Sequence, residues 1–125
     1  MSYVLLNATH VEAIHDAVLN SGELQGRALD KSLDGALARV DNRLVYGMIE
    51  DVFNLAAAYC VAVATRHEFN DANKRTAFKT MVVCLHLNGV RIIPETVKAG
   101  DLIRNVAQRC IDEDSLANWL RAKAA

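Results

Sequence analysis

Apolar residues recur every three or four positions over most of this chain, which is the period of an α-helix that buries one face. The first such stripe consists of Val11, Ile14 and Val18. Thr9 and Glu12 have the spacing of a capping box, so we expect a first helix to begin at Thr9 and to end before Gly22. Residues 22–29, which include two glycines, are expected to form a loop.

A second and a third helix are predicted next. Asp30 is expected to cap the second, whose inward-facing residues are Leu33, Ala36, Leu37 and Val40. The third is expected from Leu44 to Thr65, and its stretch 55–64 is apolar on every face. A helix that is apolar all round is surrounded by other elements, so this one is the predicted central helix of the domain. Its apolar run is too short to cross a bilayer, which takes ~20 residues.

Three more helices complete the predicted fold. One spans Lys74 to Asn88, with Gly89 as its C′ residue and an apolar side made of Ala77, Phe78, Met81, Val82 and Leu85. A short extended piece over 90–93 leads to a fifth helix around 96–110. A sixth begins at the cap Asp114, and its core residues are Leu116, Trp119 and Leu120. The expected fold is a compact all-α bundle of about six helices in a single domain, residues 1–125.

Composition narrows the class of protein. Fourteen basic and fifteen acidic residues give a net charge of -1, which disfavours a protein that binds nucleic acid through its phosphates. The apolar fraction of 52% supplies a real core and excludes disorder as the main state. The N-terminal residues lack the basic start of a signal peptide, so a cytoplasmic location is expected. The cysteines have mostly apolar neighbours and are expected to be buried, reduced thiols: Cys60, Cys84 and Cys110.

Reactive side chains crowd together in one segment, residues 66–75 (RHEFNDANKR), between the central helix and the next one. The first turn of a helix presents unpaired N–H groups and the positive end of the helix dipole, which together attract anions. Asn73, Lys74 and Arg75 add hydrogen-bond donors and positive charge suited to phosphate oxygens. The small side chain of Ala72 lets a ligand approach the backbone closely.

Three other residues of the segment complete a candidate site. A carboxylate beside a phosphate site commonly holds a divalent cation, so Asp71 is the candidate ligand for Mg²⁺. A histidine side chain can change its charge near neutral pH, so His67 is the candidate general base for a hydroxyl nucleophile. Phe69 is expected to point inward and to anchor the loop. The residues by themselves thus favour a phosphate-handling site with a histidine base.

Two other interpretations of the segment stay open at this point, and a third fails. A zinc helix of the H-E-x-x-H type would need a second histidine where Asp71 stands. A calcium loop starting at Asp71 fails, because glycine is absent from its sixth position and Val82 stands at its twelfth. A purely structural loop would use Asp71 and Asn73 to cap the next helix, but it leaves His67 and the two cations unexplained.

The remaining histidines and two arginines are expected to be structural or solvated. His15 lies beside Asp16 and is expected to be a hydrogen-bonded core residue. His10 and His86 have no companion at metal-ligand spacing. Arg39 and Arg43 are expected to lie in solvent.

Residues 67–75 resemble the motif of the Fic/Doc (Fido) family, in the form H-x-F-x-D-A-N-K-R that is typical of its Doc members. Further likeness lies in residues 14–16 (Ile-His-Asp), 37–39 (Leu-Ala-Arg) and 87–90 (Leu-Asn-Gly-Val). The resemblance therefore covers most of the chain, and it implies the Fido fold.

The resemblance also implies roles for the motif residues. His67 would deprotonate the target hydroxyl, and Asp71 would help to hold Mg²⁺. Asn73 and Arg75 would bind the phosphates of ATP, and Phe69 would be the hydrophobic anchor.

Fic enzymes, which transfer AMP, have a similar motif but carry glycine at the position of Lys74. A long cationic side chain there would fill part of the anion site and reverse the nucleotide, so that its γ-phosphate meets His67. Doc-like members are accordingly protein kinases that modify a threonine of elongation factor Tu and arrest translation. Phe78 occupies the place of the second Fic arginine, which also favours the kinase over AMP transfer. AMP transfer remains the enzymatic alternative, and a non-catalytic anion- or partner-binding module is the alternative of another class.

The resemblance implies a partner as well. No internal Ser/Thr-x-x-x-Glu inhibitory motif is visible in the sequence. A toxin of a type II toxin–antitoxin system would then be restrained by a Phd-like antitoxin, whose C-terminal segment folds into a groove on the toxin.

Overall fold

Six α-helices make up the part of the chain that the computed structural model describes, residues 3–23, 33–66, 72–92 and 96–124. They are α1 (Ala8–Val18), α2 (Leu33–Val45), α3 (Val52–Arg66), α4 (Asn73–Leu87), α5 (Thr96–Ala107) and α6 (Glu113–Lys123). These segments contain no strand, only an isolated antiparallel bridge between Ile92 and Ala124. None of the described helices is long and apolar enough to cross a membrane. The all-α prediction is confirmed.

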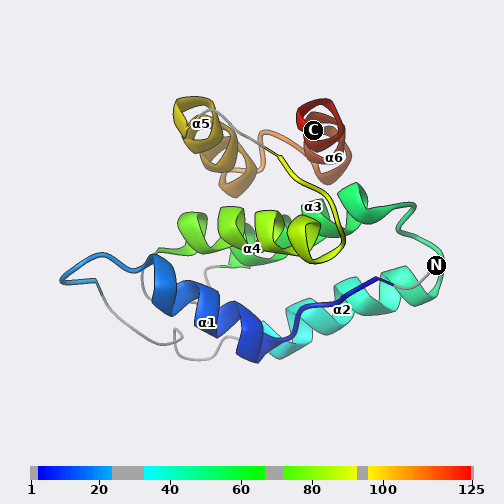
Figure 1. Ribbon diagram of the computed structural model, residues 1–125, viewed down its shortest axis with the longest axis horizontal. Coiled ribbons are helices and arrows are strands. Elements are labelled where there is room, and N and C mark those ends of the chain that lie inside the picture. The colour runs from blue at the N-terminus through cyan, green and yellow to red at the C-terminus, as the bar shows by residue number, and fades with distance from the viewer. Residues whose placement is uncertain (1–2, 24–32, 67–71, 93–95, 125) are drawn as a thin grey trace.

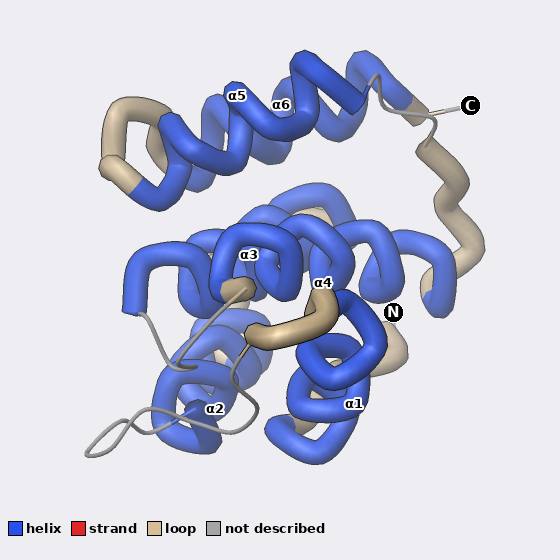
Figure 2. The backbone as a smooth tube through the Cα atoms, turned by 90° about the vertical axis from the view of Figure 1, so that its left-hand side faces the viewer, coloured by secondary structure: helices blue, strands red, loops and turns tan. Residues whose placement is uncertain are grey.

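The helices stack as pairs in three layers (Figures 1 and 2). The middle layer is formed by α3 and α4, with α1 and α2 on one side and α5 and α6 on the other. Helix α3 contacts α2, α4, α5 and α6, which explains why its sequence is apolar on every face. Its residues 55–60 are all buried, and so are Val63 and Ala64. The predicted buried central helix is therefore confirmed.

The predicted start of the central helix at Leu44 is wrong. Helix α2 continues to Val45, and α3 begins only at Val52. Gly47 separates them, because its φ of 74° is a left-handed conformation that stops a helix. Its amide donates to the carbonyl of Leu44 at 3.1 Å and so closes the end of α2. The predicted inward-facing residues of α2 are all buried: Leu33, Ala36, Leu37 and Val40.

Two predicted helix caps are also wrong, each displaced by two residues. The N-cap of α1 is Asn7, not Thr9, and its side chain accepts the amide of His10 at 3.0 Å. The imidazole Nδ1 of His10 accepts the amide of Asn7 in return, at 3.1 Å, so a histidine takes the part that glutamate usually plays. The N-cap of α6 is Asp112 rather than Asp114. The proposed cap of α2, Asp30, lies outside the described residues.

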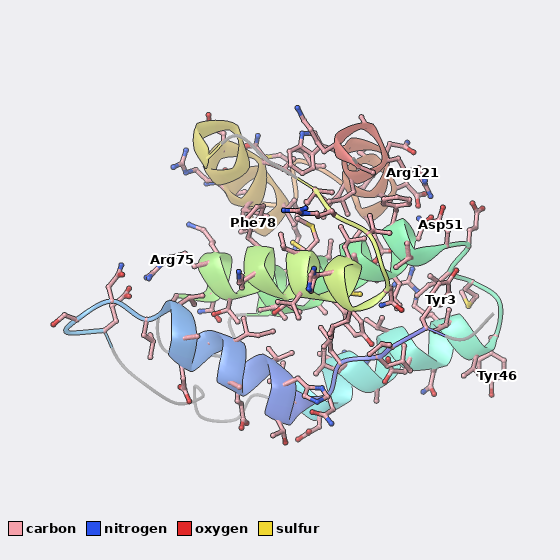
Figure 3. All side chains as sticks on the ribbon, in the orientation of Figure 1. Tyr3, Tyr46, Asp51, Arg75, Phe78 and Arg121 are labelled. Atoms are coloured by element: carbon pink, nitrogen blue, oxygen red, sulfur yellow. The ribbon has the colours of Figure 1, made fainter. Side chains whose placement is uncertain are left out.

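Ion pairs join α6 to the helices beneath it. Arg43, which was expected to lie in solvent, binds Glu113 through two hydrogen bonds, with an Nη1–Oε1 distance of 3.0 Å. Arg121 binds Asp51 just ahead of α3, with an Nη2–Oδ2 distance of 2.9 Å (Figure 3). Arg39 is exposed, as predicted. The prediction for Arg43 was wrong because its partner, Glu113, lies 70 residues away in the sequence. Helical periodicity does not reveal a partner at that distance.

The cysteines differ from one another. Cys60 and Cys84 are free, buried thiols, as predicted, and burial raises the pKa of each to about 12. The prediction is wrong for Cys110, which is exposed. This residue follows the end of α5, where Arg109 adopts a left-handed φ of 63° and turns the chain out of the core.

Candidate active site

The structure describes only the second part of the motif, from Ala72 onward. His67, Phe69 and Asp71 lie outside the described residues, as does the rest of 67–71. Their roles therefore stay predictions. The second half of the motif is described: Asn73, Lys74 and Arg75 are the first three residues of α4.

Ala72 sets the geometry at the start of α4. It is the N-cap, with a left-handed φ of 63° and ψ of 27°, and it makes no side-chain capping bond. Its carbonyl accepts both the amide of the buried Thr76, at 2.9 Å, and its hydroxyl, at 2.7 Å. The structural interpretation in which Asn73 caps the helix is therefore wrong, because Asn73 is the first helical residue. The positive end of the α4 dipole follows directly after the predicted base and metal ligand in the sequence.

Arg75 points from α4 toward the end of α1 (Figure 3). Its Nη1 donates to the carbonyl oxygen of Val18, the last residue of α1, at 2.6 Å. Its Nη2 donates to the carboxylate of Glu23. A guanidinium has five N–H donors, so these two bonds leave donors for a phosphate. Arg75 is thus a fixed cation at the start of α4.

Glu23 was not identified from the sequence, although it is the residue that holds Arg75. A tight turn presents it: Gly22 has a φ of 86°, and the amide of Glu23 donates to the carbonyl of Asn20 at 3.1 Å. The amide of Asn20 donates in return to the Glu23 carboxylate at 2.5 Å. The bond from Arg75, followed by the bond from Asn20, lowers the pKa of Glu23 below its usual value. The predicted stop at Gly22 was the only sequence signal for this turn.

Lys74 differs from Arg75 in that it is exposed. It forms no ion pair with any residue in the described part of the chain. The motif therefore has one anchored and one exposed cation at the same helix end. Such a pair can neutralise the charge of a polyphosphate from two sides.

The other histidines singled out in the sequence lie on α1 and near the end of α4. His15 is buried on α1, and its Nδ1 lies 3.7 Å from a carboxylate oxygen of Asp16, in agreement with the predicted core position. His86 is exposed near the far end of α4. Among the described residues there is no group of three or more His, Cys, Asp and Glu side chains that could hold a metal ion. The role of Asp71 as a ligand for Mg²⁺ stays a prediction, since Asp71 lies outside the described residues.

Phe78 explains how this site departs from an arginine-rich one. It lies one turn after Lys74 on α4, half-buried, and packs against the core (Figure 3). An apolar side chain in this place supplies no charge to a phosphate. The cations at the start of α4 are therefore Lys74 and Arg75.

Comparisons with a family model and with known proteins all point to the same family. The model of the Fic/DOC family matches residues 5–85. Protein kinase doc of Escherichia phage P1 is 37% identical over 110 residues, which is 87% of this chain and 86% of that protein. Toxin Doc of Mycolicibacterium smegmatis is 38% identical over 97 residues, or 74% of each chain. The residues that the family model matches include the whole motif, all of α3, and α4 up to residue 85.

Proposed function

The chain belongs to the Fic/DOC family, and on this basis we propose that it is a Doc toxin that acts as a protein kinase. The single observation that carries this proposal is the exposed Lys74 at the start of α4. It stands in a chain of which 87% matches a relative that is named a protein kinase. The proposed reaction transfers the γ-phosphoryl group of ATP to a threonine hydroxyl of elongation factor Tu. The proposed place of action is the cytoplasm, where translation occurs.

The residues at the start of α4 suit a triphosphate. Lys74 and Arg75 put two positive charges at the positive end of a helix dipole, and Arg75 keeps N–H donors beyond those used by Val18 and Glu23. Asn73 adds an amide. ATP, when bound, supplies the phosphoryl group, and Mg²⁺ supplies charge neutralisation.

Each motif residue has a defined task in this proposal. The imidazole of His67 accepts the proton of the attacking hydroxyl. Asp71 holds Mg²⁺, and Phe69 anchors the loop between α3 and α4. Lys74 occupies space beside the helix end and so favours the orientation in which the terminal phosphate faces His67. Positioning and charge are the main needs of phosphoryl transfer, and these groups supply both.

The proposed regulator is a Phd-like antitoxin that binds through its C-terminal segment. The antitoxin would hold the enzyme inactive for as long as the two proteins stay bound. Co-expression of the chain with such a segment should restore growth if the toxin assignment is correct.

The test compares two labels on ATP. Purified protein is incubated with Mg²⁺, elongation factor Tu and ATP labelled at either the γ- or the α-phosphate. We expect label from the γ-position on elongation factor Tu, and none after His67→Ala. Transfer of the α-label would instead show AMP transfer. Toxicity that survives His67→Ala would favour a non-catalytic binding module.

A further inference from the structure

A groove runs along the outward face of α4 and has no part in the proposed transfer reaction. Its volume is 330 Å³. Four β-branched apolar side chains line it: Val82, Val83, Val90 and Ile92. The first two belong to α4, and the other two belong to the segment that leads from α4 up to the layer of α5 and α6 (yellow in Figure 1). This apolar lining can hold the side chains of a bound segment.

The other lining residues of the groove are basic. Lys79, His86 and Arg91 are all exposed. Lys79 and His86 are seven residues apart on α4, so both lie on the face that carries Val82 and Val83. None of the described residues that line the groove carries a carboxylate.

These cations differ from the arginines that hold the fold together. Arg43, Arg75 and Arg121 each bind a carboxylate of this chain. Lys79 and Arg91 have no ion pair with any residue of the described segments. Positive charge concentrated around an apolar groove, in a chain of net charge -1, is complementary to an acidic segment of another protein.

We propose that this groove docks an acidic segment, with apolar anchor residues, of the protein substrate. The inference rests on the proposed kinase function and names the surface that binds the substrate outside the reacting atoms. Lys79 lies one helical turn, or ~6 Å along the axis, beyond Arg75, and His86 lies ~16 Å beyond it. A protein whose hydroxyl reaches the motif is therefore within reach of the groove on the same helix. The groove provides affinity and the motif provides chemistry.

Charge reversal in the groove tests this proposal. The variant is Lys79→Glu with Arg91→Glu, and the matched control is Arg39→Glu with Arg109→Glu, which makes the same change in net charge at exposed positions elsewhere. We expect the KM for elongation factor Tu to rise at least tenfold in the groove variant, with the KM for ATP within twofold of the wild-type value. The conservative variant Lys79→Arg with Arg91→Lys should restore the wild-type KM.

A binding measurement separates this proposal from the proposed function. In a His67→Ala background, the Kd for elongation factor Tu should rise at least tenfold on charge reversal in the groove and stay within twofold in the control. A wild-type protein that binds elongation factor Tu through the groove but transfers no label would contradict the kinase function alone. An unchanged Kd and KM would overturn the docking proposal, and so would a variant that loses only its neutralisation by an antitoxin segment, since the occupant would then be the antitoxin.

Discussion

The carboxylate of Glu23 accepts a hydrogen bond from the guanidinium of Arg75, 52 residues further along the chain. This pair joins the turn after α1 to the first turn of α4. Because Arg75 also donates to the last carbonyl of α1, the predicted phosphate-binding arginine is held by a different layer of the fold from the one that carries it. Anchored side chains of this kind keep their orientation when a ligand binds.

The pair predicts a pH-dependent contribution to stability. Arg75 lowers the pKa of Glu23 below its ordinary value of 4.5, so the pair stabilises the fold at and above that pH. The contribution is lost as the pH falls through the lowered pKa. Glu23→Gln should therefore reduce the Tm at pH 7, and this loss should shrink as the pH falls below 4.5 and through the lowered pKa, because the wild-type carboxyl is then progressively protonated.

The control for that experiment is Glu50→Gln, at an exposed glutamate. It should leave the Tm unchanged over the same pH range. A Tm difference for Glu23→Gln that stays the same from pH 7 down to the lowest pH at which the protein is folded would contradict the role of the ion pair.

The Arg75 contact also marks the limit of what the sequence predicted. Helical periodicity identified six helices and the buried α3, because burial of one face leaves a local record in the order of residues. The caps at Asn7 and Asp112 were missed because several residues before each helix can accept an amide, and side-chain geometry chooses among them. The motif was found because its residues are adjacent. Glu23 was not, because its partner is close only in the folded chain.

Thiol reactivity should separate the three cysteines. Burial raises the pKa of Cys60 and Cys84 to about 12, so only about one in 10⁴ of either thiol is ionised at pH 8. Cys110 is exposed. A disulfide reagent such as Ellman's should modify one thiol of the native protein quickly and the other two only after unfolding. Cys110→Ser should remove the fast reaction, and rapid modification of all three native thiols would show that the core opens readily.

Two residues with a left-handed backbone should respond in opposite directions to reciprocal changes. Gly89 ends α4 with a φ of 83°, and nothing lies within 4 Å of the place where a Cβ would stand. Gly89→Ala should therefore destabilise the protein by about 1 kcal/mol through backbone strain alone. Arg109 has a φ of 63° after α5, so Arg109→Gly should stabilise it by about 0.5 kcal/mol, the relief of strain less the entropy cost of glycine. Urea unfolding measures both, and changes of the same sign would contradict the explanation.

Lys74 offers the most direct test of why this site favours one phosphate over another. It is exposed in the first turn of α4 and forms no ion pair within the described structure, so its replacement should leave the core intact. Lys74→Gly removes a cation and opens space at the helix end. We expect transfer of the γ-label to elongation factor Tu to fall at least tenfold, with transfer of the α-label appearing in its place.

Glycine costs up to about 1 kcal/mol of helix stability relative to alanine, so Lys74→Ala serves as the control that removes the charge without that penalty. If both variants keep the wild-type rate of γ-transfer, Lys74 does not set the orientation of the nucleotide. If γ-transfer falls in both and α-transfer rises only with glycine, space at the helix end, and not charge alone, decides which phosphate faces His67.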